Sequence, residues 1–176
     1  MHTIERSKKE PNITFRKPRR EDGSAIWDLI ASCHPLDENS MYCNLIQCDH
    51  FSDTCVLAEM DGEPVGWISA YLTPDDIQTL FVWQVAVSEK ARGQGLGTRM
   101  LQHLAEREEC EGINRLQTTI TLDNDASWAL FGKFSSKIDG KLSSEPYFRR
   151  EDHFDGKHAT EHMVTIQFAE ELKRAA

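Results

Sequence analysis

The segment from Leu80 to Glu109 constrains the fold most, because a short strand, a glycine-rich loop and an amphipathic helix follow one another there. Residues 81–87 carry aromatic and β-branched side chains, which predicts a buried strand. From Thr98 onward, apolar residues recur at helical spacing with charges between them, which predicts a helix that continues to Glu109. The loop of residues 91–98 therefore has to connect a strand directly to the start of a helix.

A glycine-rich loop at the start of a helix is suited to binding an anion. The first main-chain N–H groups of a helix have no intrahelical acceptor, and the helix dipole adds about half a positive charge at that end. Gly93, Gly95 and Gly97 have no Cβ, so a phosphate could approach the main chain closely. The alternative interpretation is an ordinary glycine-rich turn that binds nothing.

Two common phosphate-binding motifs do not fit this loop. A P-loop has Lys-Ser or Lys-Thr directly after its last glycine, whereas Thr98 and Arg99 follow Gly97 here. A dinucleotide-binding fingerprint requires G-x-G-x-x-G, whereas the glycines of this loop are spaced G-x-G-x-G. The loop is therefore neither a nucleotide-triphosphate site nor a dinucleotide site of these types.

Composition excludes several classes of function. A formal charge of −9 argues against non-specific binding to nucleic acid or to an anionic membrane. No apolar run approaches the roughly 18 residues that span a bilayer, and no secretory signal is visible at the N-terminus. The five cysteines form no C-x-x-C pair and lack zinc-site spacing, so we expect reduced thiols, a cytoplasmic location and no metal.

The order of the elements predicts one α/β (α+β) domain with a mixed sheet and helices on both faces. We expect residues 1–12 to be a flexible leader, 13–168 to be the domain and 169–176 to be a C-terminal tail. Asp61-Gly62 predicts a hairpin turn, and residues 146–156 are expected to form a loop. The patterns predict strands at 13–16, 54–60, 65–71, 81–87, 116–121 and 161–168, and helices at 22–33, from 39 or 40, at 98–109 and at 126–134.

The run R-G-x-G-x-G from Arg92 to Gly97, after a strand ending in Val87, resembles the acyl-CoA pyrophosphate loop of the GNAT acetyltransferase superfamily. The element order resembles the GNAT fold over residues 13–168. The resemblance implies a mostly antiparallel central sheet with a V-shaped splay between its central strands, and acetyl-CoA as the acetyl donor. It implies that acetyl-CoA is bound by Val85, Val87, Arg92, Gly93, Gln94, Gly95, Leu96, Gly97, Thr98 and Asn124.

The resemblance can be narrowed to one family within this superfamily. Segments 34–42, 48–54, 81–87, 121–127 and 161–163 are similar to those of the L-2,4-diaminobutyric acid acetyltransferase family. This implies acetylation of the γ-amino group of L-2,4-diaminobutyrate, a step in the synthesis of the compatible solute ectoine, by a homodimer. The alternatives are a GNAT enzyme for another amine, such as a polyamine or a protein, and a non-catalytic acyl-CoA sensor.

Amine acetylation sets requirements for the site. The amine has a pKa near 10.4, so a base must accept its proton, and an N–H group must face the thioester oxygen. We expect Glu161 and Asp37 to face the amino groups, Val85 to supply the N–H, and Trp83 to form a pocket wall. The alternatives are a helix-capping Asp37, a solvated Glu161 and a core Trp83. Further substrate-binding candidates are Asn39, Ser40 and Tyr42.

The sequence leaves three alternatives open for the general acid: another tyrosine, a water or no dedicated group. In many GNAT enzymes a tyrosine after the fifth strand protonates the departing thiolate. The equivalent position in this chain is Phe131, which has no proton to donate. No arginine or lysine stands out as the group that would bind the α-carboxylate of the substrate.

Overall fold

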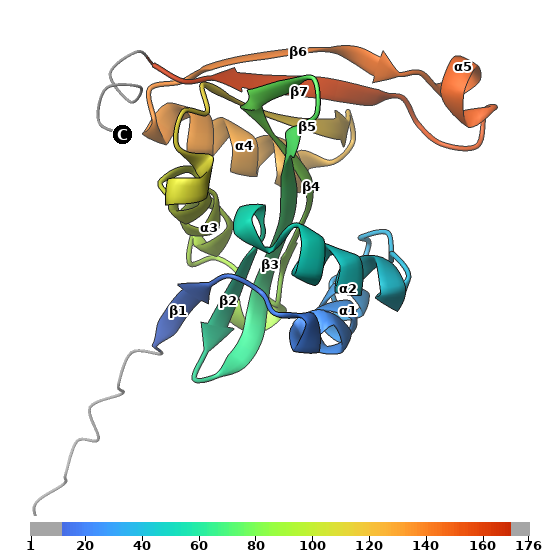
Figure 1. Ribbon diagram of the computed structural model, residues 1–176. Coiled ribbons are helices and arrows are strands. Elements are labelled where there is room, and N and C mark those ends of the chain that lie inside the picture. Colours follow the sequence, from blue (N-terminus) through green and yellow to red (C-terminus); the bar gives the residue numbers. More distant parts are fainter. Residues whose placement is uncertain (1–11, 170–176) are drawn as a thin grey trace, which may run out of the picture.

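The computed structural model describes residues 12–169, which form a seven-stranded mixed sheet with helices on both faces (Figure 1). In this sheet the spatial order is β1-β2-β3-β4-β5-β7-β6, and every neighbouring pair except β4–β5 is antiparallel. The predicted fold class is therefore confirmed. Of the expected leader at 1–12 and the expected tail at 169–176, residues 1–11 and 170–176 lie outside the described residues. The strands are β1 (Ile13–Arg16), β2 (Val56–Met60), β3 (Glu63–Thr73), β4 (Asp76–Val87), β5 (Arg115–Thr121), β6 (Lys141–Phe148) and β7 (Glu161–Gln167).

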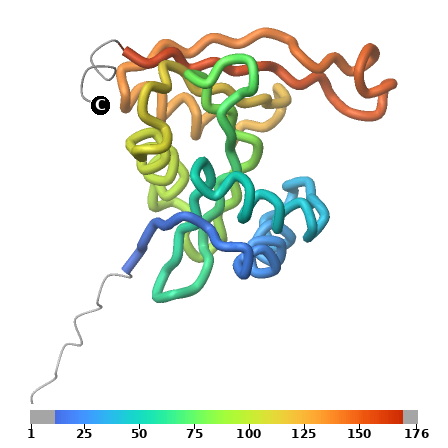
Figure 2. Tube along the Cα trace, viewed as in Figure 1, coloured from blue at the N-terminus to red at the C-terminus, as the bar shows by residue number. Residues whose placement is uncertain are grey.

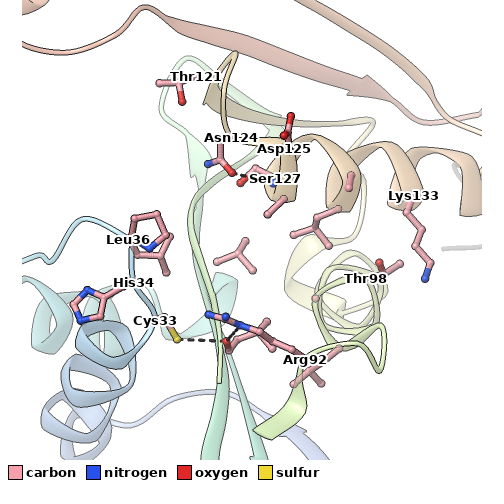
Figure 3. Close-up of a pocket in the computed structure, with 18 of the residues that line it drawn as sticks. Cys33, His34, Leu36, Arg92, Thr98, Thr121, Asn124, Asp125, Ser127 and Lys133 are labelled. Carbon is pink, nitrogen blue, oxygen red and sulfur yellow. Dashed lines mark hydrogen bonds between the residues drawn. The ribbon is translucent and has the colours of Figure 1, made fainter. Parts of the chain in front are cut away.

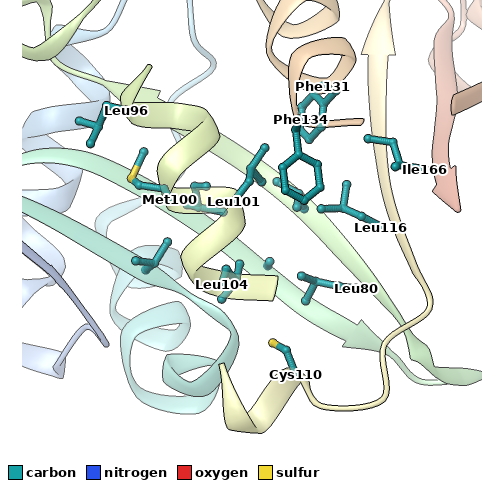
Figure 4. Packing of buried hydrophobic residues seen from close by; sticks show 14 of the residues in the cluster. Leu80, Leu96, Met100, Leu101, Leu104, Cys110, Leu116, Phe131, Phe134 and Ile166 are labelled. Carbon is teal, nitrogen blue, oxygen red and sulfur yellow. The ribbon is translucent and has the colours of Figure 1, made fainter. Parts of the chain in front are cut away.

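The helices divide between the two faces of the sheet (Figure 1). They are α1 (Gly23–Ser32), α2 (Met41–His50), α3 (Leu96–Ala105), α4 (Asp125–Lys137) and α5 (Arg150–Phe154). On one face α3 and α4 cover the larger apolar core, where Leu101 and Phe134 pack with Leu80 and Leu116 of the central strands (Figure 4). On the other face α1 packs on a smaller core that includes the fully buried Trp67. No helix among residues 12–169 has the length and apolarity needed to cross a bilayer.

The central strands β4 and β5 separate soon after they meet. They pair in parallel only where Thr79–Phe81 lies beside Arg115–Gln117. Beyond that point β4 continues to Val87 against β3, and β5 continues to Thr121 against β7. The two strands therefore diverge and leave the inner edge of each without a strand partner, which confirms the predicted splay (Figure 1).

The structure corrects two predicted helix ends: α4 continues to Lys137, three residues beyond its predicted end, and α3 ends early. Helix α3 ends at Ala105, whereas the periodic pattern predicted a helix to Glu109. Arg107 leaves the helical conformation, with φ −76° and ψ 143°, and its guanidinium Nη1 donates to the carbonyls of Asp53 and Cys55 at 2.9 and 2.8 Å. A long-range contact therefore ends the helix, although the local pattern would allow it to continue.

The segment 146–156 is also different from the prediction of a loop. It comprises the end of β6 and the helix α5, and with β7 these elements form an arm that extends beyond the rest of the molecule (Figure 2). Nearly every residue of β6 is exposed, so the strand has no alternating burial that a sequence pattern could report. Its hydrogen-bonded partner is β7, and this pairing rather than burial makes it a strand.

Candidate active site

A cavity of about 960 Å³ lies where β4 and β5 diverge. Its walls come from the end of β4, the glycine-rich loop, the start of α4, the connection between α1 and α2, and the first residue of β7 (Figure 3). The predicted site residues that line it are Asp37, Val85, Val87, Arg92, Gly93, Gly95, Leu96, Gly97, Thr98, Asn124 and Glu161. Segments that are distant in the sequence are thus brought together around one space.

Main-chain groups of β4 face this cavity. The N–H of Ser88 donates to the carbonyl of Val65 at 2.9 Å, so in the antiparallel register the groups of Val85 and Val87 point away from β3, toward the gap. The Val87 carbonyl accepts from Cys33 Sγ at 3.4 Å and from Arg92 Nε at 3.2 Å (Figure 3). The N–H groups of Val85 and Val87 and the Val85 carbonyl are therefore the ones left to bind a ligand.

The glycine-rich loop turns the chain into α3. Gly93 and Gly95 have φ values of 76° and 66°, in the left-handed region that favours glycine. Gly95 directly precedes α3, so the N–H groups of the first turn lie at the cavity wall without intrahelical acceptors. Gln94 does not line the cavity, and its side chain donates to the carbonyl of Lys90 at 3.4 Å.

Gly97 lines the cavity and also allows close helix packing. A Cβ at this position would lie 2.9 Å from Cδ1 of Leu130, which is shorter than a normal contact. The absence of a side chain therefore allows α4 to pack closely against α3. This packing brings the start of α4 to the cavity, together with Asn124, whose Oδ1 accepts from the Ser127 N–H at 3.1 Å (Figure 3).

Glu161 places a half-buried carboxylate at the cavity wall. It is the first residue of β7 and pairs with Thr121, so it lies where the gap between β4 and β5 is wide. Its Oε2 is buried and has no hydrogen-bond partner among the described residues. Burial is the main cause that raises the pKa of Glu161 above its usual value. His158, whose Nε2 lies 3.9 Å from Oε1, and the Thr119 hydroxyl oppose the shift, and the charge of Asp37 adds to it. An unpaired carboxylate oxygen of this kind favours a cationic ligand.

Asp37 faces the same cavity from the connection between α1 and α2. Its side chain is exposed, and its main-chain carbonyl accepts from Gln84 Nε2 at 2.8 Å, which ties the connection to β4. The structure therefore brings together Asp37 and Glu161, which are far apart in the sequence. It does not support the alternative in which Asp37 caps α2, because Ser40 caps that helix by accepting from the Cys43 N–H at 3.2 Å.

Four of the expected substrate-binding residues do not line this cavity: Trp83, Asn39, Ser40 and Tyr42. Trp83 is 50% exposed on β4, so the alternative of a core residue is wrong. Tyr42 is 72% exposed, and the Asn39 side chain donates to Gln84 Oε1 at 3.4 Å. In the single chain, Trp83 therefore does not form a wall of the cavity.

Sequence reasoning missed Lys133 and His158, which both line the cavity. Lys133 follows Ser127 and Leu130 at steps of three residues along α4, and this helical spacing from Asn124 could have identified it. Phe131 is buried in the larger core, as expected for a residue that cannot act as the acid. No tyrosine lines the cavity within residues 12–169, so the general acid still has no tyrosine candidate.

Comparison with known proteins assigns the family. Residues 23–135 match the family described as Acetyltransferase (GNAT) family. Over 156 residues the chain is 50% identical to the L-2,4-diaminobutyric acid acetyltransferase of Methylotuvimicrobium alcaliphilum, covering 89% of this chain and 91% of that protein. This chain belongs to the L-2,4-diaminobutyric acid acetyltransferase family. It is therefore an acetyltransferase with the GNAT fold.

Other members and neighbours agree with this assignment. The L-2,4-diaminobutyric acid acetyltransferase of Vibrio cholerae is 47% identical over 86% of this chain and 88% of its own length. The solved structure of diaminobutyrate acetyltransferase EctA from Paenibacillus lautus, in complex with L-2,4-diaminobutyric acid and coenzyme A, has a TM-score of 0.84 at 36% identity and covers 89% of this chain and 95% of that one. The ribosomal-protein-S18-alanine N-acetyltransferase from Escherichia coli is 15% identical to this chain and shares its fold, with a TM-score of 0.63. The match covers 89% of this chain and 94% of the Escherichia coli chain.

Proposed function

We propose that this protein transfers the acetyl group of acetyl-CoA to the γ-amino group of L-2,4-diaminobutyrate, a step of ectoine synthesis. The observation that carries the proposal is that one cavity is lined both by the glycine-rich loop, which is suited to an anion, and by the carboxylates of Glu161 and Asp37. A molecule with phosphates at one end and a reactive acyl group at the other matches the first part. A short amine with two ammonium groups matches the second.

The donor would lie along the open edge of β4. The main-chain N–H groups at the start of α3 would bind its diphosphate, because they have no intrahelical acceptors. The N–H of Val87 and the main-chain groups of Val85 would bind the pantetheine arm and the thioester, since they point into the gap. Asn124, whose Oδ1 is already bonded within α4, would contact the donor from the opposite wall.

The chemistry needs a deprotonated amine beside the thioester. An aliphatic ammonium has a pKa near 10.4, so Glu161, whose pKa is raised by burial, would accept its proton. Asp37 would hold the second ammonium group. The Val85 N–H would donate to the thioester oxygen as negative charge develops there, and one such donor contributes about 3 kcal/mol. No side chain of the enzyme needs to carry the acetyl group.

The test is release of CoA thiol from acetyl-CoA with L-2,4-diaminobutyrate, ornithine, lysine, spermidine and a peptide as acceptors. We expect kcat/KM to be highest for diaminobutyrate, and proton NMR of the product to show the acetyl group on the γ-nitrogen. A preference for another amine, or acetylation of the α-nitrogen, would contradict the proposal. Turnover with none of these amines, with CoA still bound, would favour an acyl-CoA sensor.

We also propose that the enzyme acts as a homodimer in the cytoplasm. Several large apolar side chains are exposed on the single chain, including Trp83 on β4 and the edge-to-face pair Tyr147 and Phe148 on the β6–β7 arm. Burying them against a second copy would remove apolar surface from water. Sedimentation equilibrium should give twice the chain mass at micromolar concentration, and a monomer at all concentrations would contradict this part.

A further inference from the structure

Lys133 is a cation of the cavity wall that neither the mechanism nor the glycine-rich motif uses. It lies on α4 and is exposed, and its Nζ is 3.8 Å from the position that a Cβ of Gly95 would occupy. Figure 3 shows its side chain extending from α4 toward α3. Within residues 12–169 no carboxylate forms an ion pair with it.

This placement is unfavourable in the absence of a ligand. The start of α3 carries a partial positive charge and outward-facing N–H groups, and cations are normally found at the other end of a helix. An ammonium beside Gly95 adds a second positive charge at the same point. An anion bound between Lys133 and the first turn of α3 would balance both charges.

The arginine of the motif is engaged elsewhere. Arg92 Nε donates to the Val87 carbonyl at 3.2 Å, and its Nη1 lies 3.8 Å from the carboxylate of Glu89. These contacts fix the end of β4 to the loop and partly neutralise the guanidinium. Lys133 therefore supplies the loop with a second cation from α4, one that forms no ion pair among residues 12–169.

We propose that Lys133 is a cofactor-binding residue whose ammonium group contacts the diphosphate of coenzyme A over Gly95. The proposal rests on the proposed function, because it assumes that coenzyme A is the ligand of the loop. Leu130 of α4 packs closely on Gly97 of α3. Because Lys133 lies three residues beyond Leu130 on α4, this packing positions Lys133 above the loop. The contact is a point charge on a partly exposed phosphate, so its effect on affinity should be moderate and dependent on salt.

The chain contains a matched control. Lys137 lies one turn further along α4, is also exposed, and does not line the cavity. Lys133→Met and Lys137→Met remove the same charge from the same helix, so a difference between them reports position and excludes a change in net charge. Lys133→Arg keeps a cation at the site and should recover most of the binding.

The experiment measures the dissociation constants of CoA, 3′-dephospho-CoA and pantetheine by calorimetry at low salt for the wild type and the three variants. We expect Lys133→Met to weaken both CoA and 3′-dephospho-CoA by about fivefold, and pantetheine not at all. Lys137→Met should stay within about twofold of the wild type for each. Melting temperatures of all variants should match the wild type, because both side chains are exposed.

The outcomes separate this inference from the proposed function. If the wild type fails to bind CoA, the proposed function itself is wrong. If the wild type binds CoA and the two methionine variants have equal affinities, only the role of Lys133 is wrong. A loss that disappears with 3′-dephospho-CoA would overturn the diphosphate contact and place Lys133 at the 3′-phosphate.

Discussion

Replacing Gly95 with alanine tests whether the turn into α3 exists for the ligand or for the fold. Gly95 has φ 66°, and an alanine in this conformation costs about 1–2 kcal/mol. Alanine also lowers the conformational entropy of the unfolded chain, which stabilises the folded state by about 0.4–1 kcal/mol. The net loss in the free energy of unfolding should therefore be about 1 kcal/mol. No clash adds to this, because the nearest heavy atom to the new Cβ is Lys133 Nζ at 3.8 Å. For a chain of this size, the melting temperature should fall by roughly 2–4 °C.

Gly62→Ala provides the control for strain alone. Gly62 has φ 87° in the hairpin between β2 and β3, with nothing within 4 Å of its Cβ position, and it does not line the cavity. Both variants should therefore lose similar stability in thermal denaturation followed by circular dichroism. In calorimetry with CoA, only Gly95→Ala should lose affinity, by about tenfold or more, because its methyl group projects over the phosphate-binding N–H groups.

The reasoning is refuted if Gly95→Ala binds CoA as tightly as Gly62→Ala does. In that case the left-handed glycine would serve the turn alone, and the diphosphate would have to bind elsewhere. A melting temperature that falls far more for Gly95→Ala than for Gly62→Ala would instead show that the loop is a structural element whose strain spreads into α3.

Three further predictions follow from single contacts. Glu161→Gln should lower kcat by at least about a hundredfold and leave CoA affinity unchanged, as expected for loss of a general base. Burial raises the pKa of Glu161, so the folded wild type loses stability as pH rises through that pKa. Glu161→Gln should therefore melt at a higher temperature than the wild type at pH 7 and at the same temperature below about pH 4. A lower melting temperature at pH 7 would contradict a carboxylate whose Oε2 is buried and unpaired. Gly97→Ala should destabilise by about 1–3 kcal/mol in urea unfolding, because its Cβ would meet Leu130 at 2.9 Å, and an unchanged midpoint would show that the helices can move apart freely. The Arg16 guanidinium lowers the pKa of Asp22, so the stabilisation by Asp22 is present above the unfolded pKa of about 3.9 and is lost as pH falls. Asp22→Asn should therefore melt at a lower temperature than the wild type at pH 7, and the two melting temperatures should converge near about pH 2. Thermal scans across pH can check this.

The sequence by itself determined the features that depend on neighbouring residues. The turn at Asp61-Gly62 was predictable because both residues adopt positive φ, at 52° and 87°, as a tight hairpin requires. A helix was predicted from residue 39 or 40, and α2 begins at Met41 with Ser40 as its cap; the glycine-rich loop was likewise predicted to lead into a helix, which is α3. The family was also determined at this level, because similar segments extend over most of the chain. Glu161 and Asp37 were named through that resemblance, and the cavity now places them together.

Only the tertiary structure decided the features that depend on contacts between distant segments. The end of α3 at Ala105 follows from the hydrogen bonds of Arg107 to a segment about 50 residues away in the sequence, at Asp53 and Cys55. Strand β6 depends on pairing with β7 and has no buried face that a pattern could reveal. The same holds for the position of Lys133 over Gly95, which requires α4 to pack on α3. Local propensity is encoded within a few residues, whereas these contacts form only when the sheet brings its two halves together around the gap.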